Sequence, residues 1–176
     1  IKVLQFATET KFVELIPTRI VHSLKEAYEH YRWALEHELE GTVVKDPDAI
    51  WEDTTSKNQV KLKLEFAVEL KITGFNAGNG KNVDLFGSIA CESADGKLKT
   101  NAHGFSDELR KQLNEDKEAL IGKIITVKAN SIMPPTNKDY WSLFLPIFVE
   151  VRHDKREANT LEEIVAQYDA SIDKVG

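Results

Sequence analysis

The stretch KLKLEFAVELKIT, residues 61–73, alternates between polar and apolar residues along almost its whole length. Because successive side chains of a β-strand point to opposite faces, this alternation predicts a strand with one buried face. Lys61 and Lys63 lie on the other face, two residues apart. They are either part of a solvated strand face or a pair of cations that binds one anion. The residues expected on the buried face are Leu62, Leu64, Phe66, Val68, Leu70 and Ile72.

The chain beyond this strand alternates turn signals with short apolar runs. NAGNGKN (76–82) and SADG (93–96) predict turns on either side of the strand VDLFGSIACES. Further strands are predicted for KLKTNA and for residues 124–129 and 141–152, and Ser106 is the expected N-cap of a helix over residues 106–113. Residues 65–152 therefore form five strands with one helix between the third and the fourth. That order fits a small Greek-key barrel of the OB type, whose face and loops often bind nucleic acids.

A helix is predicted over residues 23–39, upstream of these strands. Ser23 and Glu26 form a capping-box pattern. A short strand follows at residues 42–44, and one helix with up to three strands is too little to bury both faces of a sheet. The sequence also lacks an initiator Met, so we expect it to be a piece of a longer protein. The apolar stripe of the helix is interpreted as core packing: Leu24, Ala27, Tyr28, Tyr31, Leu35 and Leu39.

The composition is that of an ordinary folded protein. Its 176 residues fit one domain or two small ones, with 41% hydrophobic and 30% charged residues. The net charge of −6 argues against a strongly basic nucleic-acid binder, so any such binding depends on where the lysines lie. Cys91 is the single cysteine, which excludes an internal disulfide and favours a reducing, cytoplasmic compartment; we expect it to be buried in a strand. No apolar run is long enough to span a bilayer, and residues 1–12 lack the pattern of a signal peptide.

Three short polar motifs stand at the ends of predicted elements. They are EG at residues 40–41, KLK at 61–63 and RHDK at 152–155. Each has a simple structural explanation when it is taken alone: a glycine that ends a helix, a solvated strand face and an exposed charged turn. Their order along the chain is more specific, because EGTVVK is followed by a turn, by SKNQVKLK, by five strands and then by RHDK.

This order resembles the C-terminal half of the ATP-dependent DNA ligases, nucleotidyltransferases that work through a lysyl-AMP intermediate. EGTVVK resembles the family's motif IV, KLK its motif V, and RHDK its motif VI, R-x-D-K. The segment GSIACESADGKLKTNAHGFSDELR resembles the OB domain of DNA ligases more than that of capping enzymes or RNA ligases. KDYWSLFLPIFVEVRHDKREANTLEEI is similar to the end of the T-even phage-type ligases.

The resemblance implies an α+β, mainly β architecture in three parts. Residues 1–64 would be the C-terminal part of an adenylation (nucleotidyltransferase) domain, residues 65–155 a five-stranded OB-fold barrel, and residues 156–176 a C-terminal helical tail. It implies a monomeric enzyme, with no membrane association, that seals nicks in duplex DNA. The N-terminal half of that enzyme would come from the same polypeptide or from a companion chain.

The resemblance also implies roles at the nucleotide. Lys61 and Lys63 would contact the α-phosphate of ATP or AMP, where ammonium groups act as compact point charges. Glu40 would lie beside the nucleotide and help to hold Mg²⁺, which prefers carboxylate oxygens together with substrate phosphates. Catalysis in such enzymes is mostly positioning and electrostatic stabilisation of phosphoryl oxygens.

Motif VI and the barrel receive their roles from the same resemblance. Arg152 and Lys155 would reach the β- and γ-phosphates when the barrel closes over ATP, and Asp154 would fix their geometry. A different face of the barrel would then meet DNA, and Ser106, at a helix start, would offer free backbone N–H groups to a phosphate. For Phe105, a buried loop anchor and a contact in the minor groove are both open. The expected DNA-binding residues are Lys99, Phe105, Ser106 and Arg110.

The sequence departs from the family pattern at several positions. The K-x-D-G motif, which carries the nucleophilic lysine, does not occur, so this chain cannot form lysyl-AMP in the family's way. Thr55 and Gln59 stand where relatives often have Arg and Trp, and Ala67 stands where many have a hinge Asp; Glu69 is expected to supply that acidic function. Two other hypotheses are a non-catalytic OB module that binds single-stranded DNA or RNA, and a relative of the capping enzymes or RNA ligases.

Overall fold

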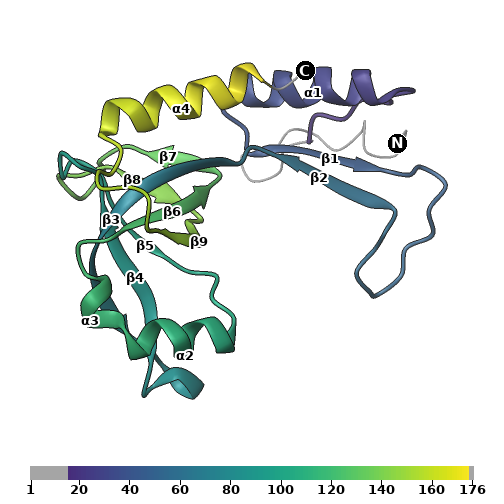
Figure 1. Cartoon of the computed structure of the whole chain (residues 1–176). Coiled ribbons are helices and arrows are strands. Elements are labelled where there is room, and N and C mark those ends of the chain that lie inside the picture. The colour runs from purple at the N-terminus through teal and green to yellow at the C-terminus, as the bar shows by residue number, and fades with distance from the viewer. Residues whose placement is uncertain (1–15, 175–176) are drawn as a thin grey trace.

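The computed structural model describes residues 16–174 of the chain, so residues 1–12, discussed above for their lack of a signal-peptide pattern, lie outside the described part. Figure 1 shows a barrel with short helices at one end and a long β-hairpin that projects away from it. The elements are α1 (Leu24–Glu36), β1 (Gly41–Lys45), β2 (Gln59–Lys63), β3 (Phe66–Ala77), the 3₁₀ turn η2 (Gly80–Asn82), β4 (Phe86–Glu92), β5 (Lys99–Ala102), α2 (Asp107–Glu115), α3 (Lys117–Leu120), β6 (Ile124–Ala129), β7 (Ser131–Met133), β8 (Ser142–Phe144), β9 (Ile147–Arg152) and α4 (Leu161–Asp173).

The barrel is one antiparallel sheet of five strands in the order β5-β4-β3-β6-β9. Helices α2 and α3 connect its third strand, β5, to its fourth, β6, where the sequence predicts one helix. The two edges of the sheet meet: the His103 N–H donates to Pro146 O at 3.1 Å, and the Phe148 N–H donates to His103 O at 2.8 Å. These bonds close the sheet into a barrel, so the predicted fold class and strand order are confirmed.

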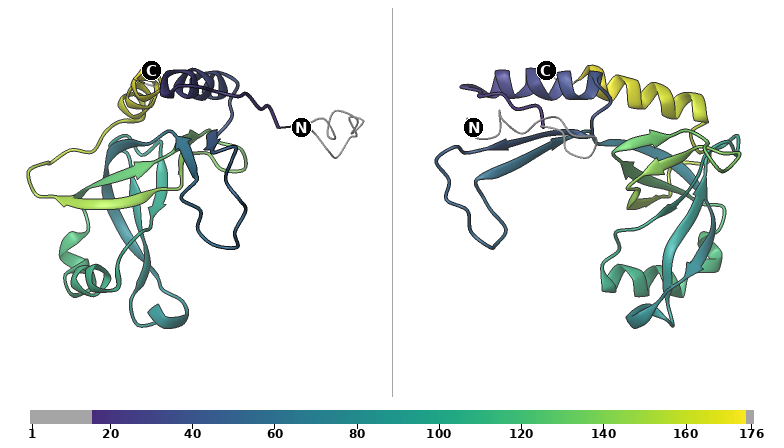
Figure 2. Two further views of the ribbon diagram at one scale, coloured as in Figure 1. Left: turned by 90° about the vertical axis from the view of Figure 1, so that its right-hand side faces the viewer. Right: turned by 180° about the vertical axis from the view of Figure 1, so that it is seen from behind.

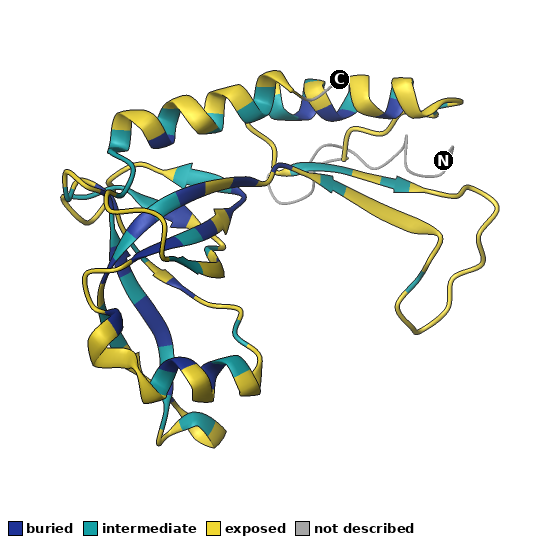
Figure 3. Cartoon of the chain, in the orientation of Figure 1, coloured by how far each residue is buried: buried dark blue, intermediate teal, exposed yellow. Residues whose placement is uncertain are grey.

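The core of the barrel lies on the predicted face of β3. Val68, Leu70 and Ile72 are at most 1% exposed, and Leu70 pairs with Ile125 of β6, which is also fully buried. Cys91 packs in the same cluster, as predicted, and burial raises the pKa of its thiol to about 12. A buried apolar face of this size is the main stabilising contribution to such a domain. Figure 3 shows the buried residues concentrated in the barrel strands.

The predicted strand over residues 61–73 is in fact two strands in two sheets. β2 ends at Lys63 and pairs with β1, whereas β3 begins at Phe66 and belongs to the barrel. Leu64 and Glu65 connect them. The apolar alternation continues across this connection, because Leu64 is buried like Phe66, whereas Leu62 is half-buried. The alternation alone therefore gives no sign of the break.

The predicted strand over residues 141–152 is also divided. β8 and β9 are separated by Leu145, whose φ of 52° is left-handed, and by Pro146. Proline has no N–H to donate to a ladder, so the strand cannot run through it. β8 instead pairs with β7 in a small separate hairpin beside the barrel.

Helix α1 is shorter than predicted and its apolar stripe is only partly buried. The helix ends at Glu36, and Leu39, three residues further, is 45% exposed. Ala27, Tyr31 and Ala34 are buried. Leu24 and Tyr28 are 70% and 37% exposed, so the prediction that the whole stripe packs in a core is wrong for them and for Leu39. Between residues 16 and 64, this helix and two strands are the regular elements, rather than a helix with up to three strands.

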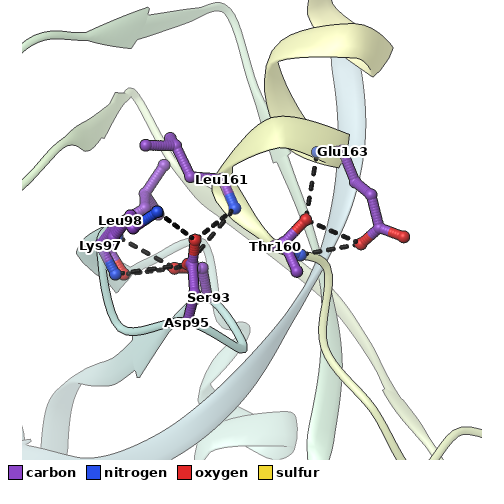
Figure 4. A network of polar contacts seen from close by, with 7 residues as sticks. All are labelled: Ser93, Asp95, Lys97, Leu98, Thr160, Leu161 and Glu163. Carbon is purple, nitrogen blue, oxygen red and sulfur yellow. Dashed lines mark hydrogen bonds and ion pairs between the residues drawn. The ribbon is translucent and has the colours of Figure 1, made fainter.

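Helix α4 is anchored where it begins (Figure 4). Thr160 is its N-cap, and with Glu163 it forms a capping box. Asp95, in the turn between β4 and β5, accepts from the backbone N–H of Leu161 at 3.3 Å and from the hydroxyl of Ser93 at 2.7 Å. The helix then packs along β3 and β7 and ends close to α1, as both views in Figure 2 show. No helix among residues 16–174 is long and apolar enough to cross a membrane.

Candidate functional site

The two lysines of the KLK motif lie on one face of the hairpin. In the β1–β2 register Lys61 is opposite Val43 and Lys63 is opposite Gly41, so both side chains leave the same face of the ribbon. The other face carries Thr42, whose hydroxyl lies 3.0 Å from His30 Nδ1 of α1. The helix therefore covers the face opposite the lysines, and both lysines are exposed to solvent.

The glycine of the EG motif is required by a close approach between strands. A Cβ at Gly41 would lie 2.1 Å from the carbonyl oxygen of Leu62, and the φ of Gly41 is 153°. Helix α1 has ended five residues earlier, with His37 at its C-cap, so the alternative explanation of Gly41 as a helix-ending glycine is wrong. Only glycine allows β1 to pair with β2 at this point and to hold Lys63 in register.

Glu40 is exposed directly before this strand. Among residues 16–174 no group of three or more His, Cys, Asp and Glu side chains could hold a metal ion. Mg²⁺ is commonly held by one or two carboxylates together with phosphates and water. Glu40 can therefore contribute one carboxylate ligand, and the remaining ligands have to come from outside the described residues.

Asn130, which the sequence analysis missed, joins the hairpin to the barrel. The residue is 9% exposed, its Nδ2 donates to Leu64 O at 2.5 Å, and its Oδ1 accepts from Lys63 Nζ at 3.3 Å. One of the two lysines is thus held by a residue of the barrel. The only sequence signal for this role was an asparagine directly after the apolar strand IITVKA. Its partners lie more than sixty residues earlier in the chain, so no local pattern indicates them.

The RHDK motif forms an ion-pair cluster at the end of β9. Arg152 Nε donates to Asp154 Oδ1 at 2.9 Å, and Nη2 donates to Oδ2 at 2.7 Å. This two-point contact lowers the pKa of Asp154 to about 2. The third nitrogen of Arg152, Nη1, donates to Glu69 of β3, and Lys155 Nζ lies 3.1 Å from the other oxygen of Glu69. Glu69 therefore joins the two cations of the motif.

The cluster borders an open cavity of about 680 Å³. Glu69, Lys71, Lys155, Asn159 and Glu163 are among the residues that line it. Glu40, Lys61 and Lys63 do not line this cavity, and among the described residues no hydrogen bond or ion pair joins them to Arg152 or Lys155. The structure thus brings the motif VI residues together on the barrel and holds the two lysines on the hairpin.

Two of the residues expected at the DNA face take part in the packing of the barrel: Arg110 is buried and Phe105 is half-buried. Phe105 stacks edge-on against Phe86 at 5.0 Å and contacts Phe148 at 5.1 Å. Arg110 is 9% exposed, and its guanidinium donates to the carbonyls of Phe86 and Gly87. Phe105 is thus an anchor of its loop, as one of its two explanations proposed, and Arg110 acts in the described packing as a structural cation.

The other two residues remain at the surface. The Ser106 side chain accepts from the backbone N–H of Leu109 at 3.1 Å, which is the predicted N-cap of α2. Lys99 on β5 is exposed, and its ammonium lies 5.7 Å from the centre of the Tyr140 ring. Lys138 lies over the same ring at 5.2 Å. Lys99 and Lys138 are therefore two exposed cations that share the Tyr140 ring near the predicted DNA face.

Comparison with known proteins gives consistent matches. Residues 77–152 match the family model described as DNA ligase OB-like domain. The DNA ligase of Enterobacteria phage T4 is 34% identical over 166 residues, covering 89% of this chain and 34% of that protein. The DNA ligase of Methanospirillum hungatei is 30% identical over 164 residues, covering 81% of this chain and 30% of that protein. The solved structure of Pmar-Lig_PreS3 has a TM-score of 0.64 and 28% identity, and the match covers 73% of this chain and 30% of that one.

The fold and these matches define the class as an OB-fold barrel of the DNA ligase type, preceded by a β-hairpin. The resemblance to DNA ligases of the T-even phage type, inferred from the EG, KLK and RHDK motifs, is confirmed. The chain spans about a third of the length of the T4 ligase that it matches.

Proposed function

We propose that this chain is part of an ATP-dependent DNA ligase that seals nicks in duplex DNA through lysyl-AMP and DNA-adenylate intermediates. One observation carries the proposal: a hairpin with two same-face lysines is joined directly to an OB barrel that ends in the Arg152–Asp154 pair. The similarity to curated DNA ligases supports it. Within the proposal, residues 1–64 complete an adenylation domain, residues 65–155 are the OB domain and residues 156–176 are the tail.

The roles of the hairpin follow from its charges. Lys61 and Lys63 bind the α-phosphate of ATP or AMP from one side, because their ammonium groups leave the same face and have no carboxylate partner among the described ion pairs. Stabilisation of charge on the phosphoryl oxygens lowers the barrier in each step of ligation. Glu40 contributes a carboxylate to Mg²⁺ beside that phosphate.

Motif VI acts in the first step alone. Arg152 and Lys155 orient the β- and γ-phosphates of ATP, so that pyrophosphate departs in line with the attacking lysine. That lysine comes from the remaining part of the ligase. Nicked duplex DNA binds to the barrel in the later steps, with Lys99 at its surface.

Two substitutions in the complete ligase test these roles. Lys155→Ala should abolish self-adenylation while it leaves the sealing of pre-adenylated nicks largely intact. Lys61→Ala should impair both self-adenylation and the sealing of pre-adenylated nicks, because the α-phosphate takes part in each of these reactions. An equal loss of both activities in Lys155→Ala would contradict the role given to motif VI. Incubation of this chain alone with labelled ATP and Mg²⁺ should leave no covalent label, and a stable label would show that the nucleophile has been misplaced.

A further inference from the structure

Glu69 occupies the centre of the motif VI cluster. Its side chain is 16% exposed, and its two oxygens accept from different cations: Oε1 from Arg152 and Oε2 from Lys155 at 3.1 Å. These are the two cations that, under the proposed function, bind the β- and γ-phosphates of ATP. A carboxylate thus occupies the donors that the phosphates would use.

The backbone of Glu69 fixes the chain that carries these cations. The Glu69 N–H donates to Asn159 Oδ1 at 2.7 Å, and the Asn159 N–H donates to Glu69 O at 2.7 Å. The Asn159 carbonyl in turn accepts from the N–H of Ala94 at 2.9 Å. The segment 152–159 is therefore attached at residue 69 by its Asn159 end, whereas its Arg152 end belongs to β9 and pairs with Ile124 of β6. Helix α4 follows at once with its capped first turn. The segment is held by backbone bonds, so the side chains of Arg152 and Lys155 can change partner without the segment moving.

The charges of the cluster cancel. Arg152 and Lys155 carry one positive charge each, and Glu69 and Asp154 carry one negative charge each. Arg152 uses Nε, Nη1 and Nη2 in these contacts, so its fork is occupied on both sides. A polyphosphate that approaches this arrangement meets neither a net positive charge nor a free guanidinium edge.

We propose that Glu69 is a latch that competes with the triphosphate for Arg152 and Lys155. It holds both side chains on the barrel, and they bind phosphate only when phosphate oxygens displace its carboxylate. Asp154 keeps its two-point contact with Arg152 throughout, because that contact uses the other edge of the guanidinium. Glu69 is thus a positioning residue that acts through the two cations, and its role rests on the proposed function of motif VI.

The test titrates this chain with inorganic tripolyphosphate and measures the affinity by isothermal titration calorimetry, a readout that does not depend on the side chain at residue 152. Glu69→Gln keeps the shape of the side chain and the backbone bonds to Asn159, but it removes the competing charge. It should bind tripolyphosphate about tenfold more tightly than the unmodified chain, because two charge-assisted contacts no longer have to be broken. Glu69→Asp keeps the charge and should bind as weakly as the unmodified chain. Glu65→Gln is the matched control. Glu65 lies four residues before Glu69 and pairs with Lys128, so this variant also removes one carboxylate charge from an ion pair, and it should change the affinity less than twofold.

The outcomes separate the latch from the proposed function. An affinity of Glu69→Gln that is equal to or weaker than that of the unmodified chain overturns the latch. The double variant Glu69→Gln/Arg152→Ala should lose the gain, and a retained gain shows that the phosphate binds elsewhere and also overturns it. If Arg152→Ala weakens binding while Glu69→Gln has no effect, only the latch fails. If neither variant changes the affinity, the role of motif VI in the proposed function fails with it.

Discussion

Arg110 offers the sharpest test of how the barrel is built. It was expected at the DNA face, yet its guanidinium lies inside, 5.3 Å from the centres of the Phe86 and Phe105 rings. It also donates to two carbonyls at the start of β4, with Gly87 O at 3.2 Å. We predict that Arg110→Ala destabilises the fold and leaves the affinity of the folded protein for nicked DNA within twofold.

The magnitude follows from the contacts that are lost. Hydrogen bonds to a charged donor contribute about 1.5–3 kcal/mol each, and a desolvated cation over an aromatic face adds about 1–2 kcal/mol. Part of this is offset, because the variant no longer has to desolvate a guanidinium. We therefore expect a net loss of about 3 kcal/mol, with two carbonyls left unpaired beside the Phe86–Phe105 contact.

The assay is urea unfolding followed by far-UV circular dichroism. With an m-value of about 2 kcal/mol/M, the midpoint should fall by about 1.5 M while m itself is unchanged. Lys111→Ala, the exposed neighbour, is the control and should shift the midpoint by less than about 0.3 M. A midpoint that stays in place for Arg110→Ala, together with a tenfold loss of DNA affinity, would refute the structural interpretation and restore the DNA contact.

Three further predictions concern other parts of the chain. Because burial raises the pKa of Cys91 to about 12, iodoacetamide at pH 8 should label the native protein about 1,000-fold more slowly than the protein in urea; equal rates would contradict the burial. Gly41→Ala should break the β1–β2 pairing, because its Cβ would lie 2.1 Å from Leu62 O, and faster amide exchange in β1 checks this. The Asp154 carboxyl should titrate near pH 2, and near pH 4 in Arg152→Gln. Since its folded pKa lies below the unfolded value, the pair stabilises the fold above about pH 4, and this contribution is lost as the pH falls towards 2; an Arg152→Gln titration that stays near 2 would contradict the pairing.

The barrel could be predicted from sequence because its signals are local. The alternation in residues 66–72, the SADG turn and the cap at Ser106 each depend on neighbours in the chain. The break after Lys63 could not be predicted, since Leu64 continues the apolar alternation although it belongs to a connection between two sheets. The pattern of residue types is the same on both sides of that connection, although β2 is largely exposed and β3 is buried on one face.

The site residues show the same division. The same-face placement of Lys61 and Lys63 follows from strand periodicity alone, and it is confirmed by the register. The burial of Arg110 and the pairing of Glu69 with motif VI depend on partners from other strands. In a single sequence, an arginine in SDELRKQL has the pattern of an exposed helix residue. Tertiary contacts decide such positions, and no local pattern reports them.

Asn130 couples the orientation of the barrel to the position of one lysine on the hairpin. Its side chain donates to Leu64 O and accepts from the ammonium of Lys63. Glu65, which follows Leu64 in the chain, pairs with Lys128 of β6. A turn of the barrel about this junction would have to pull the amide of Asn130 from both of its partners together. A change in the orientation of the barrel relative to the hairpin would therefore also change the contact of Lys63, one of the two lysines of the KLK motif.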